Sequence, residues 1–380
     1  MDQLFEKAEK NRDLSRFFQA ENIYKRLIGF PRLSGQEKAE AFLGLADVQR
    51  IQGKFTASLR HYQKAYGLLR KEGLESALDA KVGWALAARA VGRPQEALQE
   101  LRKALVFYQK QKDLQGQAFV HWALGGTLRI AGNMKEGLKE LQTALRMFQI
   151  IKNSEGISYT CCALGGIFRM LGRYAESGKY YREANRRMRR RKDTFGIAYS
   201  YCGLGNVQRM AGRFKQALPF YKKAEKLYGT IGDRVSYAYT LWSIGTTYKM
   251  LGQYSSAHRA FYKADNLFKK TGDTRGRIYT LLGFAEIEYL KNHYPKFLKT
   301  YWHSAEKLSE KFKFTWENLH VKTLLRLSIF QSFKKIEPAY SPKEWKKTKR
   351  GLRKAMAFTE VSYLKKGSKF NPESIPVNWP

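Results

Sequence analysis

The segment Leu204–Ala224, with the sequence LGNVQRMAGRFKQALPFYKKA, decides the fold. Before Gly212, large apolar residues recur at the spacing of an amphipathic helix, as they do again after Phe214. Glycine ends a helix and permits a tight turn, because it adopts positive φ angles without a steric penalty. The segment therefore predicts two helices joined by a turn at Gly212.

The same arrangement recurs along most of the chain with a period of 40 residues. The turn position holds Gly53, Gly92, Gly132, Gly172, Gly212 and Gly252, and Asn292 follows 40 residues after the last of them. An aromatic or large apolar residue stands two positions later in most copies (Phe55, Met134, Tyr174, Phe214, Tyr254 and Tyr294), and an alanine stands twelve positions later (Ala65, Ala104, Ala144, Ala184, Ala224 and Ala264). One hairpin cannot bury its apolar face alone, so the copies must stack.

Two further features of the period concern backbone packing. A glycine stands seven residues before the turn (Gly125, Gly165, Gly205 and Gly245), and with the alanines it lets paired helices approach closely. The pairs Gly232-Asp233 and Gly272-Asp273 are expected to close the second helix and to cap the next one.

The quoted segment, through Leu204-Gly205, Gly212-Arg213-Phe214, Ala217, Tyr221 and Ala224, resembles the signature of the tetratricopeptide repeat (TPR) family. The period of 40 exceeds the usual 34, and Arg189, Gly229 and Lys269 stand where the family's terminal proline is common. In both respects the repeat is similar to the long TPR variant of Pins-type spindle-orientation adaptors and rapsyn. The resemblance covers roughly residues 1–312, and the first repeat, recognisable at Phe17, Ala20 and Tyr24, is degenerate. It implies an all-α, right-handed superhelical α-solenoid of about eight TPR hairpins.

The C-terminal region departs from the period. Residues 313–337 are predicted to form a capping helix, because the exposed end of a solenoid must be covered. Ser341-Pro342-Lys343-Glu344 is a typical helix start, and it predicts a basic helix within residues 338–380, followed by an extended tail. This helix either docks as part of the cap or rests on a membrane surface or nucleic acid. We favour the cap.

The charge of the chain restricts its partners. The sequence has 70 Lys and Arg against 33 Asp and Glu, a formal net charge of +37. Such a charge favours acidic proteins, nucleic acid or anionic membranes, and it does not choose among them. The run Arg186-Arg187-Met188-Arg189-Arg190-Arg191-Lys192 is its densest part; we expect a solvated convex edge there, and a phosphate-contacting patch is the alternative.

The resemblance implies that the first helix of each hairpin lines a concave groove. The helical wheel then places three sets of residues toward the groove. They are an aromatic set thirteen residues before the turn (Phe119, Tyr159, Tyr199, Tyr239 and Tyr279), a basic set three before it (Arg50, Arg89, Arg129, Arg169, Arg209 and Lys249), and a mostly small set six before it that includes Asn206 and Thr246. Ten before the turn stand Trp122, Cys162, Cys202 and Trp242.

Each set has an alternative role. The tyrosines either line the groove or pack between neighbouring repeats, and the basic residues either bind a partner or are solvated. Arginine suits bidentate capture of a carboxylate or phosphate. The resemblance implies that Asn206 and Thr246 bond the backbone of an extended peptide. The candidate partner-binding residues are Arg129, Arg169, Arg209, Lys249, Tyr159, Tyr199, Tyr239, Asn206, Trp122 and Trp242.

No catalytic or cofactor motif accompanies these sets. The six histidines fall at unrelated repeat positions, and Cys161, Cys162 and Cys202 form no C-x-x-C pair. We therefore expect no enzyme activity, no cofactor, no metal and no small-molecule substrate. With neither a signal peptide nor a membrane span expected, the localisation predicted is cytoplasmic.

The predicted function is a protein–protein interaction scaffold whose basic, tyrosine-lined groove captures an acidic peptide or partner protein. Two alternatives remain: non-sequence-specific binding of RNA or DNA, and peripheral docking on an anionic membrane surface.

Overall fold

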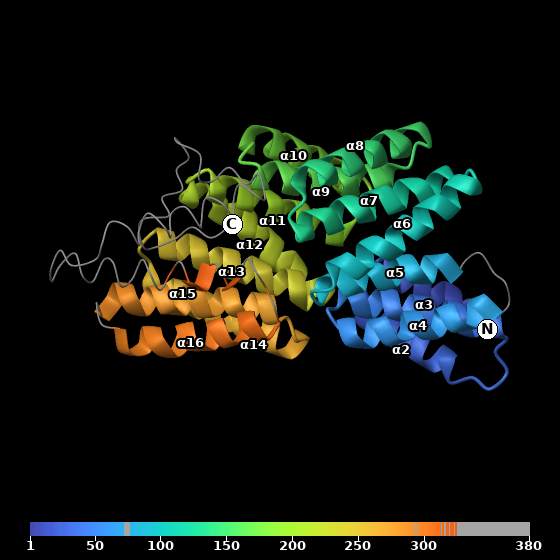
Figure 1. Ribbon diagram of the computed structural model, residues 1–380, viewed down its shortest axis with the longest axis horizontal. Helices are drawn as coiled ribbons and strands as arrows, with labels where there is room; N and C mark the ends of the chain where they lie inside the picture. The colour runs from blue at the N-terminus through green and yellow to red at the C-terminus, as the bar shows by residue number, and fades with distance from the viewer. Residues whose placement is uncertain are drawn as a thin grey trace. The chain divides into compact units, whose positions relative to one another are not determined.

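The computed structural model describes residues 1–71, 77–292, 295–312, 314, 317–318, 320–322 and 324. Sixteen helices and no strand occur in this part of the chain, and consecutive helices form eight hairpins (Figure 1). The first helices are α1 (Asp2–Asp13), α3 (Gly35–Ile51), α5 (Ala77–Ala90), α7 (Leu114–Ala131), α9 (Ser154–Met170), α11 (Thr194–Met210), α13 (Arg234–Met250) and α15 (Thr274–Asn292). The second helices are α2 (Phe17–Ile28), α4 (Phe55–Lys71), α6 (Pro94–Lys110), α8 (Met134–Ile150), α10 (Tyr174–Arg190), α12 (Phe214–Ile231), α14 (Tyr254–Thr271) and α16 (Pro295–Lys311). The predicted all-α helical-repeat solenoid is confirmed.

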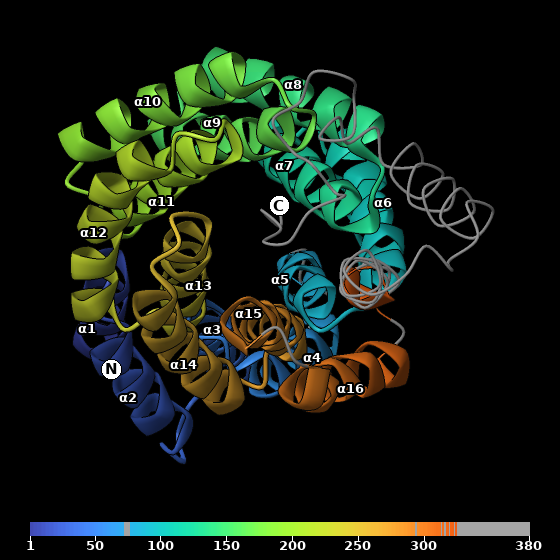
Figure 2. The ribbon, with the colours of Figure 1, turned by 90° about the vertical axis from the view of Figure 1, so that its left-hand side faces the viewer.

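The contacts divide the chain into two compact units. The first unit comprises Met1–Ile167, Ser177–Tyr201 and Lys226–Val235, and the second comprises Phe168–Glu176, Cys202–Glu225 and Ser236–Pro380. Within the first unit, α7 and α9 lie on the inner side of the curved stack and α8 and α10 on its outer side (Figure 2).

The predicted turns have the backbone that glycine was expected to supply. All six turn glycines have positive φ, from 73° at Gly172 to 93° at Gly132. The N–H of each turn glycine donates to the carbonyl oxygen of the basic residue three positions earlier, as from Gly172 to Arg169 at 3.0 Å and from Gly212 to Arg209 at 2.9 Å. This bond ends the first helix, so the basic set stands in its last turn.

The turns between hairpins are also repeated. Gly232 and Gly272 have φ of 83° and 71°, as a helix-closing residue should. The carboxylate of Asp273 accepts the N–H of Gly276 at 2.9 Å, so the predicted cap of the next helix is confirmed there. In the three preceding turns the equivalent positions hold Lys112, Lys152 and Lys192, whose φ values are 55°, 54° and 57°. The sequence did not reveal these three left-handed lysines.

Small residues inside each hairpin allow large rings to pack against backbone. A Cβ on Gly165 would lie 2.8 Å from the ring of Tyr181, and one on Gly205 would lie 2.6 Å from that of Tyr221. Ala184 and Ala224, on the facing helices, are fully buried. The close approach predicted from the small residues is confirmed.

The last described residues pack on the final hairpin of the second unit. Val321 and Leu324 are fully buried in a cluster with Ala305 and Leu282. The Trp302 indole N–H donates to the Val321 carbonyl at 3.2 Å. This packing suits the predicted cap. Most of residues 313–337, all of 338–380, and Tyr294, which stands two positions after Asn292, lie outside the described residues.

Candidate functional site

Two of the predicted tyrosines join neighbouring repeats. In the first unit the Tyr159 hydroxyl donates to Asp193 Oδ2 at 2.9 Å, and in the second the Tyr239 hydroxyl donates to Asp273 Oδ1 at 3.3 Å. Burial, and then the neighbouring aspartate, raise the pKa of both phenols. The packing alternative therefore holds for these hydroxyls, because each is bonded to the aspartate that begins the next hairpin.

The aromatic set is more exposed at two of its positions. Phe119 is 42% exposed and Tyr199 is 36% exposed. The Tyr199 ring stacks on Phe195, with centroids 6.5 Å apart, and Phe119 lies 5.4 Å from the Trp122 ring. These rings are the ones that remain accessible in the first unit.

The basic set reaches from each repeat toward the next. In the first unit, Arg89 Nη1 donates to the Ala123 carbonyl at 3.2 Å and lies within 3.4 Å of Thr127 Oγ1. Burial, and then the charges of Arg50 and Arg129, lower the pKa of Arg89 to about 9. Arg129 is half-buried, and no acidic partner of its side chain occurs among the described residues. These arginines therefore repel one another along the inner side of the unit.

The first and last members of the basic set have acidic neighbours. Arg50 Nη2 lies 3.2 Å from Asp47 Oδ1. Lys249 Nζ lies 2.6 Å from Glu286 Oε2, and both side chains are fully buried. Lys249, predicted to contact a partner, is thus neutralised inside the protein, and a flanking, accessible position is wrong for it.

Arg169 and Arg209 of the second unit differ from those end members. Arg209 is fully buried, and its guanidinium lies 5.3 Å from the centroid of the Trp242 ring. Its pKa is lowered, first by burial and also by the positive charge of Arg169. The Nε and Nη1 atoms of half-buried Arg169 are shielded from solvent and have no hydrogen-bond partner among the described residues. Two guanidinium nitrogens held away from water without acceptors are costly, so this arrangement favours a bound anion.

Asn206 lies on α11 in the second unit. Its Oδ1 accepts from the Tyr221 hydroxyl at 2.9 Å and from Ser243 Oγ at 3.2 Å. Among the described residues, its Nδ2 has only a weak contact, 3.7 Å to Cys202 Sγ. The two donors fix the amide orientation, so the N–H₂ group is left as a donor for a ligand carbonyl.

Thr246, Trp122 and Trp242 of the predicted site are half-buried or buried. Thr246 is 1% exposed, and its Oγ1 has no hydrogen-bond partner among the described residues. The Trp242 indole donates to the Tyr279 carbonyl at 3.3 Å, which makes it an inter-repeat contact. The Trp122 indole N–H, in the first unit, is buried and unpaired in the described part of the chain. Tyr221 and Ser243, which orient Asn206, were not among the predicted site residues.

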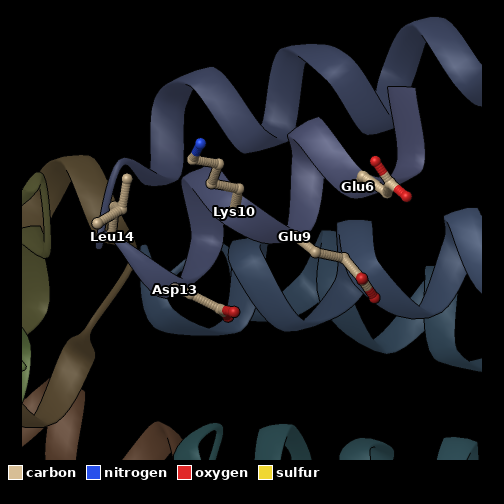
Figure 3. Close-up of a pocket in the computed structure, with 5 residues that line it drawn as sticks. All are labelled: Glu6, Glu9, Lys10, Asp13 and Leu14. Atoms are coloured by element: carbon tan, nitrogen blue, oxygen red, sulfur yellow. The ribbon is translucent and has the colours of Figure 1, made fainter. Parts of the chain in front are cut away.

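A depression on the surface of the first unit is mostly acidic. The depression in Figure 3 is lined by Glu6, Glu9, Lys10, Asp13 and Leu14, all from α1 and the residue after it. No cluster of His, Cys, Asp and Glu suited to a metal ion occurs among the described residues. In the same part of the chain, no helix has the length and apolar character needed to cross a bilayer.

Comparison with known proteins agrees with the repeat architecture. Residues 157–230 and 197–270 match the model of the tetratricopeptide repeat family. No curated protein matches the sequence.

Several solved structures share the fold. A Rap protein complexed with competence and sporulation factor aligns over 79% of this chain and 86% of its own, at 15% identity and a TM-score of 0.61. NprR in complex with its cognate peptide NprX aligns over 87% and 97%, at 16% identity and a TM-score of 0.57. The Cut9–Hcn1 assembly of APC/C aligns over 86% of this chain and 55% of that one, at 16% identity and a TM-score of 0.57.

Proposed function

Because this chain belongs to the tetratricopeptide repeat family, we propose that it is a non-enzymatic adaptor that captures an acidic peptide segment. In the second unit, Arg169 and Arg209 supply the positive charge for the peptide's carboxylates, and Asn206 holds its backbone. The comparisons support peptide capture as a class, because the similar Rap and NprR structures hold a signalling factor and a cognate peptide.

The observation that carries the proposal is the state of Arg169. Its buried Nε and Nη1 are strong donors without acceptors among the described residues, and the nearby positive charge of Arg209 increases the cost of that state. A carboxylate would accept from these donors and offset the repulsion. The Asn206 amide, held by Tyr221 and Ser243, presents its N–H₂ to a peptide carbonyl.

The proposal assigns different weights to the predicted site residues. Arg129, Tyr199 and Trp122 stay as proposed contacts in the first unit, where Tyr199 is exposed and the other two are half-buried. The polar groups of Tyr159, Tyr239 and Trp242 bond to neighbouring repeats, so we assign them no direct bond to a peptide. Lys249 is assigned no direct contact, since Glu286 already pairs with it.

Selection of random 12-residue peptides displayed on phage, against the full chain, tests the proposal. We expect the enriched peptides to carry spaced Asp or Glu residues. Their affinity, measured by fluorescence anisotropy, should fall by about 10-fold or more in Arg169→Gln/Arg209→Gln, because each lost charge-assisted hydrogen bond contributes about 1.5–3 kcal/mol.

The matched control is Arg182→Gln/Arg189→Gln, which removes the same charge from exposed positions on α10. Enrichment of neutral or basic peptides would contradict the proposal, as would equal loss of affinity in both variants. Circular dichroism of each variant checks that the helices persist.

A further inference from the structure

A rim of three lysine-tipped turns lies at one edge of the first unit. Helices α6, α8 and α10 are the second helices of successive hairpins, so their C-terminal ends share an edge. The ion pair of Arg191 with Glu155, at 2.7 Å, joins the start of α9 to the end of α10 at that edge. We name the exposed turn residues Lys112, Lys152 and Lys192 the lysine rim.

The backbone of the lysine rim is unusual for its residue type. The three lysines have φ values of 55°, 54° and 57°, in the left-handed region. Residues other than glycine, Asn and Asp rarely adopt this backbone conformation, because Cβ crowds the carbonyl oxygen. The equivalent positions of the next two turns hold Gly232 and Gly272. A lysine at a backbone position where glycine would fit without strain motivates the hypothesis that the side chain has a function.

The acidic and amide groups near the rim are already occupied. Asp113, Asn153 and Asp193 accept N–H groups of the first turns of α7, α9 and α11, and Glu155 pairs with Arg191. Lys112, Lys152 and Lys192 have no ion pair within the described residues. Their charges are therefore available to an external anion.

Exposed aliphatic side chains stand beside these lysines. Ile150 is 71% exposed, Val106 53% and Leu114 45%. They come from the ends of α8 and α6 and from the start of α7, the same elements that flank Lys112 and Lys152. An anionic bilayer supplies both negative headgroups for the lysines and an apolar layer for the aliphatic side chains. A nucleic acid backbone would satisfy only the charges.

We propose that the lysine rim, with Ile150, Val106 and Leu114, rests on an anionic phospholipid surface. The residues of this docking surface belong to the first unit, whereas Arg169, Arg209 and Asn206 of the proposed peptide site belong to the second.

Co-sedimentation of the full chain with vesicles tests the docking surface. The vesicles are phosphatidylcholine alone, or phosphatidylcholine with about a third phosphatidylserine, an anionic content that attracts basic surfaces. We expect binding only to the anionic vesicles, weakened by salt. The variant Lys112→Gly/Lys152→Gly/Lys192→Gly should lose at least about 10-fold in partition coefficient, since each cation near such a surface adds attraction. Because glycine relieves the left-handed strain, this variant should unfold at a temperature no lower than the wild type.

A control variant tests whether vesicle binding depends on the position of the lysines or on the total charge of the chain. Lys139→Gln/Lys222→Gln/Lys263→Gln removes three charges from other exposed helical sites and should keep its binding. Ile150→Ser should weaken binding without changing the charge. The proposal fails if the rim variant binds like the wild type, if both triple variants lose binding equally, or if plain phosphatidylcholine binds as well. Loss of single-stranded DNA binding in the rim variant, with vesicle binding unchanged, would assign the rim to nucleic acid and overturn the proposal.

Discussion

Lys249 Nζ lies 2.6 Å from Glu286 Oε2 in the second unit, and neither side chain is exposed. Burial lowers the pKa of Lys249, and the carboxylate of Glu286 opposes that shift. A basic residue that sequence periodicity places beside the groove thus serves to join α13 and α15.

Replacing one member of this pair should be far more harmful than replacing both. Lys249→Met removes the buried cation that pairs with the carboxylate of Glu286, which we expect to cost about 3–5 kcal/mol of unfolding free energy. Lys249→Met/Glu286→Leu should recover most of that loss. Urea denaturation followed by circular dichroism measures both. The control Lys269→Met removes an ion pair with Asp265. The lysine is 52% exposed, and Asp265 keeps a hydrogen bond from Thr280, so stability should change by less than about 1 kcal/mol. Equal losses in the single and double variants would show that the pair is not coupled.

Replacement of two helical glycines by alanine should change the stability of the chain in opposite directions. In Gly205→Ala the new Cβ would lie 2.6 Å from the Tyr221 ring, and we expect a loss of about 1–3 kcal/mol from overpacking. In Gly229→Ala the new Cβ would meet no atom within 4 Å, so helix propensity should stabilise the chain by about 0.5–1 kcal/mol. Thermal unfolding temperatures compare the two variants directly. A stabilised Gly205→Ala would contradict the close packing of α11 on α12.

A contact between distant repeats of the first unit should protect α11. The Phe17 ring, 3% exposed, meets the Phe195 ring edge-on at 6.2 Å. Phe17→Ala should cost about 3–5 kcal/mol locally and speed hydrogen exchange in residues 194–201. Phe148→Ala, a buried phenylalanine of another repeat, is the matched control and should leave that segment unchanged. Unaltered exchange at residues 194–201 in Phe17→Ala would rule out the contact.

Acid should loosen the end of the second unit through His320. Burial lowers the pKa of His320 from 6.5 to about 4. The folded state thus favours the neutral imidazole. The contribution of this preference to the free energy of unfolding is complete above pH 6.5 and is lost as the pH falls toward 4. Between pH 7 and 5 the loss should reach about 2 kcal/mol. Hydrogen exchange of residues 300–312 should therefore accelerate over that range, and less so in His320→Gln. His303→Gln, at a side chain that is 78% exposed, should retain the full pH effect. An unchanged pH response in His320→Gln would show that His320 is not the group responsible for it.

The repeat was predictable because its turns need glycine, and glycine is visible at a period of 40 residues. The turns at Lys112, Lys152 and Lys192 were not, since lysine gives no signal of a positive φ. The helical wheel placed Lys249 correctly on its helix but carried no information on the next repeat, where Glu286 buries it. For the same reason the wheel left the tyrosines undecided, because the bond from Tyr159 to Asp193 spans two hairpins.

The central claim is that Arg169 contacts a carboxylate of a bound peptide, and a double-mutant cycle tests it most directly. Fluorescence anisotropy would give the dissociation constants of a selected peptide and of its single Glu→Gln variants, each with the wild type and with Arg169→Gln. The account predicts one acidic position whose replacement has little further effect once Arg169 is replaced, a coupling of at least about 1 kcal/mol. Additive losses at every acidic position of the peptide would contradict it.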